Sequence, residues 1–161
     1  MAHYLKNLSR ARRRAARSID IRRSVSGRRF SAEALERRRL LTAITWTGTF
    51  DHTNWNQPGN WSTNTVPTAA DDVTINTANT IQSNSTQAVH NLTFNNGTIA
   101  GSGELDVGGA FHWVNGTLDT GGKTVVVNTG SLAFDPGNHE LNRELDLNGP
   151  ATWTSGNIGL S

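Results

Sequence analysis

The C-terminal two thirds of the chain alternate apolar and polar residues in short runs. Residues 92–94 (Leu-Thr-Phe), 105–107 (Leu-Asp-Val) and 145–147 (Leu-Asp-Leu) each place two apolar side chains on one face. A fourth run, 125–127 (Val-Val-Val), continues the series. Each run leads into Asn and Gly residues, which tolerate the positive φ values of tight corners. The pattern predicts short β-strands separated by turns.

Two further strands are predicted in each repeat of this pattern, because every turn is followed by another short apolar or β-branched segment. They are expected at 111–114, 132–134 and 151–154, and after the turns at 98–99, 117–118 and 157–158. The least regular segment, 135–137 (Asp-Pro-Gly), is expected to bulge outward as a loop.

The same residues also recur at a fixed distance. Segments 104–116 and 144–156 share Glu-Leu-Asp, Gly, Trp and Gly at equal spacings, forty residues apart, and 125–127 lies halfway between them. A period of about twenty residues is the length of one solenoid coil, which buries its apolar side by stacking on its neighbours. We therefore predict an all-β parallel β-helix. The alternative, an antiparallel sandwich, does not require such recurrence.

Stacking of these coils predicts which side chains meet in the core. The expected columns are Leu105, Val125 and Leu145; Val107, Val127 and Leu147; and Trp113, Phe134 and Trp153. Because the chain stops at 159–161 without a polar cap, which terminal repeats normally carry, we expect a longer protein or a frayed last coil.

Charge divides the chain into two parts. Residues 1–45 carry thirteen basic residues against three acids, a net +10, whereas 46–161 carry two basic residues against ten acids, a net −8. The chain has no cysteine, so it has neither a disulfide framework nor a thiolate metal site, and no run reaches the ~20 apolar residues of a membrane-spanning helix. The divisions predicted are an arm at 1–45, a Trp-rich cap with the first strands at 46–80, and coils at 81–161.

The arm is rich in arginine, which favours a solvated, unfolded segment, followed by a short helix at about 32–42. Three interpretations compete for it. One is a secretory signal, including a twin-arginine type at 28–30, although the apolar segment that such signals need is missing. Another is binding of nucleic acid through phosphate neutralisation, without sequence preference. The third is a sorting role, which a resemblance implies, and a plain solvated basic helix without a partner is the alternative to all three.

One element of the arm resembles a known sorting signal. Residues 35–41 (Leu-Glu-Arg-Arg-Arg-Leu-Leu), after an arginine-rich leader and before a Trp- and Gly-rich region, are similar to the LEPR-XLL element of large bacterial surface and secreted proteins. The matching positions are Leu35, Glu36, Arg38, Leu40 and Leu41. Arg37 stands where that family has proline. The resemblance implies export and an interaction with sorting machinery.

The Trp-rich segment carries a series of spaced motifs. In order they are Trp-x-Gly at 46–48, Trp-Asn at 55–56, Asn-Trp-Ser at 60–62 and Pro-x-x-x-Asp-Asp-Val-x-Ile at 67–75. This series resembles the opening of bacterial autotransporter-like and adhesin-like β-helical surface proteins. The resemblance implies a right-handed parallel β-helix on the cell surface. Physically, Trp46, Trp55 and Trp61 suit a lid over the first coil. The alternative is that these three rings bind surface glycans by stacking.

Candidate catalytic chemistry is confined to four acids. Glycan hydrolysis needs two positioned carboxylates, and Glu104, Asp106, Glu144 and Asp146 are expected on the outer face. Two such pairs would lie roughly 9.6 Å apart, two strand spacings, so repetition favours a structural role. A calcium site at 71–72 is an alternative to a simple turn. The sequence assigns no catalytic residue, metal or cofactor.

The sequence as a whole predicts a non-enzymatic, exported surface or secreted protein with an adhesin-like or envelope-structural role. Expected partners are sorting machinery, surface glycans and other cell-surface proteins. The alternatives are a polysaccharide lyase or hydrolase on the same fold, and nucleic-acid binding by the arm.

Overall fold

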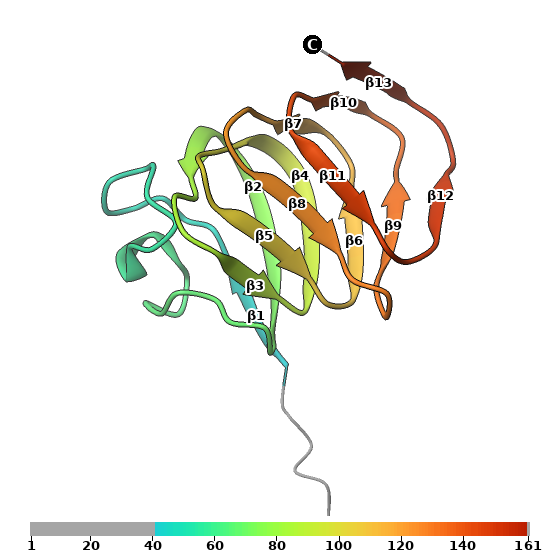
Figure 1. Ribbon diagram of the computed structural model, residues 1–161. Coiled ribbons are helices and arrows are strands. Elements are labelled where there is room, and N and C mark those ends of the chain that lie inside the picture. The colour runs from blue at the N-terminus through green and yellow to red at the C-terminus, as the bar shows by residue number, and fades with distance from the viewer. Residues whose placement is uncertain (1–40, 161) are drawn as a thin grey trace, which may run out of the picture. The chain divides into compact units, whose positions relative to one another are not determined.

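The computed structural model describes residues 41–160, and this part of the chain is a parallel β-solenoid of about five turns (Figure 1). Its thirteen strands are β1 (Thr42–Thr45), β2 (Asp71–Gln82), β3 (Gln87–Val89), β4 (Asn91–Ala100), β5 (Glu104–Val107), β6 (Ala110–Trp113), β7 (Gly116–Leu118), β8 (Lys123–Val126), β9 (Ser131–Phe134), β10 (Asn138–Leu141), β11 (Glu144–Leu147), β12 (Ala151–Trp153) and β13 (Asn157–Leu160). One 3-10 turn, η1, covers Pro58–Asn60. The predicted all-β parallel β-helix is confirmed.

From β5 onward three strands make each coil, and each pairs with its equivalent in the next coil, whereas the longer β4 pairs with both β6 and β7. One sheet has the order β12-β9-β6-β4-β7-β10-β13, with β2 on β4 and β1 on β2, and a second has the order β11-β8-β5-β3. Every pairing between these strands is parallel. The antiparallel sandwich is therefore excluded, because its neighbouring strands would run in opposite directions.

The coil length is visible in the hydrogen bonds that join neighbouring coils. Asn91 bonds to Asp72 and Asn115 bonds to Asn96, each across 19 positions. Across the coil that contains 135–137, Asn138 bonds to Asn115 over 23 positions. The extra residues are absorbed at corners, so the strands on either side stay in register.

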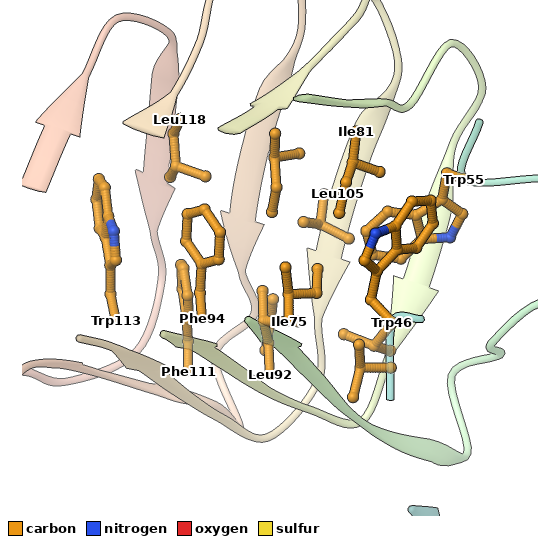
Figure 2. Packing of buried hydrophobic residues seen from close by; sticks show 14 of the residues in the cluster. Trp46, Trp55, Ile75, Ile81, Leu92, Phe94, Leu105, Phe111, Trp113 and Leu118 are labelled. Carbon is orange, nitrogen blue, oxygen red and sulfur yellow. The ribbon is translucent and has the colours of Figure 1, made fainter. Parts of the chain in front are cut away.

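Stacked apolar columns fill the interior (Figure 2). Trp113 pairs with Phe94 on one side and Phe134 on the other, and Phe134 pairs with Trp153. Neighbouring ring centroids in this column lie 5.7 to 6.5 Å apart, and Trp113 and Phe94 are fully buried. The aromatic column predicted from Trp113, Phe134 and Trp153 is confirmed and extends further back along the chain.

The other two predicted columns are wrong by one position in the middle coil. Leu105 and Leu145 both pair with Thr124, and Val107 and Leu147 both pair with Val126. Val125 instead lies in register with Asp106 on the outward face. Three consecutive valines carry no alternation, so the sequence alone does not fix which of them points inward.

A strand that was not predicted follows directly after the segment expected to form a loop. Residues 135–137 form the corner, and β10 follows at once with His139 fully buried. The two ring nitrogens of His139 lie 2.8 Å from the Trp113 carbonyl oxygen and 3.0 Å from the Asn157 carbonyl oxygen. A ring N–H that donates to one of these carbonyl oxygens has a partner inside the core, which explains how an Asn-His-Glu run can form a solenoid strand.

The start of the described chain differs from the predicted helix. The interval 32–40 lies outside the described residues, but Thr42 already belongs to β1, which pairs with β2 through Ile44 and Val73. The β-branched residues that were expected to end the helix therefore form the first strand instead.

Candidate functional site

Two polar surfaces on the outer wall of the solenoid are candidates for function. The first is a charged cluster on the sheet formed by β5, β8 and β11. Lys123 lies in register between Glu104 and Glu144, and its Nζ lies 3.1 Å from Glu104 Oε2 and 3.5 Å from Asp146 Oδ2. One ammonium group thus links carboxylates of the two coils on either side of its own.

Local electrostatics distinguish the members of this cluster. The pKa of Asp106 is raised, first by desolvation and then by a hydrogen bond and repulsion from Glu104. The pKa of Lys123 is also raised, chiefly by its hydrogen bond and ion pair with Glu104. Two carboxyl groups that share a hydrogen bond beside a cation are a form of acid–base pair, although ion-pair networks without catalytic function shift pKa values in the same directions.

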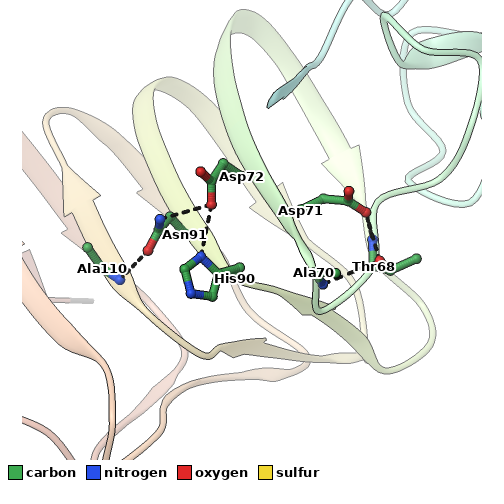
Figure 3. Close-up of polar contacts among 7 residues, drawn as sticks. All are labelled: Thr68, Ala70, Asp71, Asp72, His90, Asn91 and Ala110. Atoms are coloured by element: carbon green, nitrogen blue, oxygen red, sulfur yellow. Dashed lines mark hydrogen bonds and ion pairs between the residues drawn. The ribbon is translucent and has the colours of Figure 1, made fainter. Parts of the chain in front are cut away.

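Polar ladders run along the corners between sheets. In the first, Asp72 Oδ1 accepts a hydrogen bond from Asn91 Nδ2 at 2.9 Å and lies 3.0 Å from His90 Nδ1 (Figure 3). Asn91 Oδ1 in turn accepts the backbone N–H of Ala110. The ladder satisfies corner groups that strands leave unpaired, so these polar residues hold coils together.

The second ladder borders a groove. Asn115 Nδ2 donates to Asn96 Oδ1, and Asn157 Nδ2 donates to Asn138 Oδ1, each at 3.2 Å. Asn115 Oδ1 accepts the backbone N–H of Asn138, also at 3.2 Å. Beside these amides lies an open groove of about 370 Å³, whose lining includes Glu140. This second candidate surface follows the solenoid axis across successive coils, because the three lining amides come from consecutive coils.

Two glycines belong to the lining of this groove. Gly97 and Gly116 have φ values of 121° and 105°, which side chains rarely adopt. A Cβ at Gly116 would lie 2.6 Å from the Gly97 carbonyl oxygen and 2.9 Å from the Phe94 ring. The coils can therefore approach this closely here only with glycine.

The Asp71-Asp72 pair does not converge on one point. Asp71 Oδ2 accepts hydrogen bonds from the Thr68 backbone N–H and hydroxyl, at 2.8 and 2.7 Å, whereas Asp72 belongs to the ladder with Asn91. The geometry matches the predicted turn. Within residues 41–160, no group of three or more His, Cys, Asp or Glu side chains is arranged to hold a metal ion.

The three tryptophans proposed for glycan contact are inside the protein. Trp46, Trp55 and Trp61 are 4%, 0% and 1% exposed, and both other rings meet Trp61 edge-on at 4.9 Å. Trp61 Nε1 donates to the Trp55 carbonyl oxygen. A ring must expose a face to stack on a sugar, so the glycan-contact assignment is wrong and the predicted role as a packed lid agrees with the burial.

Residues 35–40 of the sorting-like element lie outside the described residues. Of the five matching positions, only Leu41 is described; it is 46% exposed and precedes β1. The groove was missed by sequence reasoning, which treated Asn96 and Asn115 only as turn residues. Their recurrence one coil apart was the signal that could have revealed it.

Comparison of the chain with family models, with curated proteins and with solved structures finds no match. Among the described residues, no helix has the length and apolar character needed to cross a membrane.

Proposed function

We propose that this chain is an exported, non-enzymatic protein of the cell surface or of the secreted fraction, with an adhesive or envelope-structural role. The observation that carries the proposal is the use of its recurring acids: Glu104 and Asp146 both pair with Lys123 across coils. Because these acids pair with a lysine of the neighbouring coil, they form a regular structural surface on the outer wall of the solenoid. Such a surface suits attachment to another surface.

Two further features support the proposal. The first is a continuous apolar column behind the wall, which keeps outward side chains at a regular spacing of about 4.8 Å. The second is the arm, whose residues 35–41 resemble a sorting element of bacterial surface proteins. Export and the interaction with sorting machinery rest on that resemblance.

Adhesion is tested by incubating the labelled full chain with isolated bacterial envelopes and measuring the bound fraction at low and high salt. Because the arm is strongly basic, its nonspecific attraction to anionic envelopes is screened at about 0.5 M salt. The proposal expects binding that persists at high salt. Binding that disappears with salt, or equally tight and salt-steep binding to RNA, contradicts it.

Export is tested separately by fusing residues 1–45 to a reporter in a bacterium that secretes LEPR-XLL proteins. Leu40→Ser in the sorting-like element should reduce export, whereas the control Ala34→Ser, one residue before the element, should not. Equal export of both variants contradicts the sorting role.

The raised pKa of Asp106 beside Glu104 favours a second candidate function, hydrolysis or lysis of polysaccharides. It is tested by release of reducing or unsaturated sugars from a panel of acidic and neutral polysaccharides. Glu104→Gln and Asp106→Asn are the variants, and Glu144→Gln, in the last coil, is the control. If both variants abolish turnover and the control retains it, an enzymatic function replaces the non-enzymatic proposal.

A further inference from the structure

We infer that the groove beside the Asn96–Asn115–Asn138 ladder binds an extended, uncharged glycan chain that lies along the solenoid axis. The inference deepens the proposed function and rests on it, because it names the ligand class of the adhesive wall. The groove lies on the β4, β7 and β10 side of the molecule, away from the charged cluster on β5, β8 and β11.

The shape of the groove fits a linear polymer. Its lining includes Gly97 and Gly116, which have no side chain, and runs from Ala78 on β2 across β4 and β7 to Glu140 on β10. Ala78 lies where β2 shifts register against β4, between Asn76 and Thr80, so this irregular stretch of β2 contributes to the lining. A volume of about 370 Å³ lies within the range of ligand sites in proteins.

The chemistry of the lining selects an uncharged, hydroxyl-rich ligand. Asn96, Asn115 and Asn138 offer amides, Thr98 and Thr117 offer hydroxyls, and Glu140 offers the only charge in the groove as the structure describes it. Its lining has no basic side chain to attract phosphate or sulfate and no aromatic or large apolar side chain to bury a lipid or an apolar peptide. The carboxylate accepts hydrogen bonds from hydroxyl groups and repels anionic chains.

The ladder leaves hydrogen-bonding capacity free for such a ligand. An asparagine side chain offers two N–H donors and two acceptor lone pairs. Asn115 uses one donor toward Asn96 and one lone pair toward the Asn138 backbone N–H. One donor and one acceptor therefore remain, and the ladder holds the amide in place at no additional cost in side-chain entropy on binding.

The spacing of the groove amides indicates that the ligand lies along the solenoid axis. Coils repeat at the strand spacing of about 4.8 Å, so the groove presents an amide to the ligand at each step of that length. A polymer with a similar repeat can make the same contact at successive units. This arrangement predicts that affinity rises with oligosaccharide length until the groove is filled.

The test measures binding of neutral and acidic oligosaccharides, from two to eight units, to the full chain by calorimetry. Thr117→Lys places a long side chain in the groove from an outward position on β7. Thr93→Lys is the matched control, since Thr93 is also outward, between His112 and Thr74 in register, and lies outside the groove. Equal melting temperatures of the two variants show that both fold.

The expected result is length-dependent binding of a neutral oligosaccharide that falls about tenfold or more in Thr117→Lys, the size of two lost hydrogen bonds, and is unchanged in Thr93→Lys. Glu140→Gln should keep neutral binding and also admit acidic chains, because the repulsion is removed. Absence of neutral binding, equal loss in both lysine variants, or preference for acidic chains overturns the inference. If envelope adhesion persists in Thr117→Lys, the proposed function stands and the groove is excluded as its site.

Discussion

The two ends of the solenoid meet solvent in opposite ways. At the N-terminal end, Trp46, Trp55 and Trp61 are buried over the first coil. At the C-terminal end, Leu147, Trp153 and Leu160 are 41%, 59% and 75% exposed, although they continue the same inward columns. Position in a column therefore does not bury a side chain; burial also requires a layer on top of it.

Polar contacts strengthen this contrast. Asn60, fully buried behind the lid, accepts the backbone N–H groups of Phe50 and Asp51 through Oδ1 and donates to Asp51 Oδ1 and the Asn54 carbonyl oxygen. The lid is thus fastened by a fully used amide as well as by ring packing. At the far end, β11, β12 and β13 are edge strands of their sheets in the described chain.

The largest expected effect comes from replacing tryptophan by alanine at each of the two ends of the solenoid. Trp61→Ala should cost about 3–5 kcal/mol, because it removes a buried ring and its hydrogen bond. Trp153→Ala should cost less than about 1 kcal/mol, because that ring is 59% exposed. Denaturant unfolding of both variants measures the difference. Similar losses would break the comparison.

The interior column that contains Leu105 and Leu145 has an unfavourable polar residue between them. Thr124 is fully buried between Leu105 and Leu145, and its hydroxyl has no hydrogen-bond partner within residues 41–160. Thr124→Val keeps the shape and removes an unsatisfied polar group, so we expect a gain of about 1 kcal/mol in unfolding free energy. Val126→Thr, the reverse change two positions on, serves as a control that should destabilise. Destabilisation by Thr124→Val would contradict the observed register.

Acid should loosen the N-terminal lid selectively. The pKa of Asp51 is lowered from its ordinary 3.8 by the backbone N–H of Asn54, then by that of Thr53, and then by Asn60. The folded lid therefore holds this proton less tightly than the unfolded chain, and its contribution is present above pH 3.8 and lost as the pH falls through the lowered value.

The titration of Asp106 changes the stability of the fold in the opposite direction. Because desolvation and Glu104 raise its pKa, the folded coil gains stability as the pH falls from neutral through the raised value. Protection factors from segment-resolved hydrogen exchange, corrected for the intrinsic pH dependence of amide exchange, should fall between pH 6 and 3 in residues 50–62 of the wild type and change less in Asp51→Asn. A uniform fall along the chain would show that neither carboxylate is decisive.

The smallest effect concerns the exposed end. Leu160→Lys should change the unfolding free energy by less than about 0.5 kcal/mol, because the side chain is 75% exposed, and it should reduce binding of a hydrophobic dye. Leu118→Lys, at the buried position of the same column, should prevent folding. Equal tolerance of both changes would remove the distinction between covered and open coils.

The success of the sequence prediction depended on how distinctive each residue was. Tryptophan and phenylalanine fixed the aromatic column, because few rings occur and each needs burial. The valine run at 125–127 led to a wrong register, because three identical residues do not show which of them faces the interior. His139 was unpredictable as a core residue, because its burial depends on two carbonyl oxygens brought near it by distant coils.

The candidate site was harder to predict than the fold. Glu104, Asp106, Glu144 and Asp146 were correctly placed on the outer face, but the bridging by Lys123 needs the actual register. The groove depends on glycine conformations and on amides stacked across coils, which no local pattern specifies. The sorting-like element remains a prediction.

A separation of 19 residues recurs in several cross-coil hydrogen bonds and makes the molecule modular in length. Duplicating or removing a block of that size would preserve every column, whereas an odd-numbered change within a strand would turn charged side chains into the interior. The length of such a solenoid can change during evolution by whole coils. Each coil adds or removes about 4.8 Å, while the cross-section stays constant.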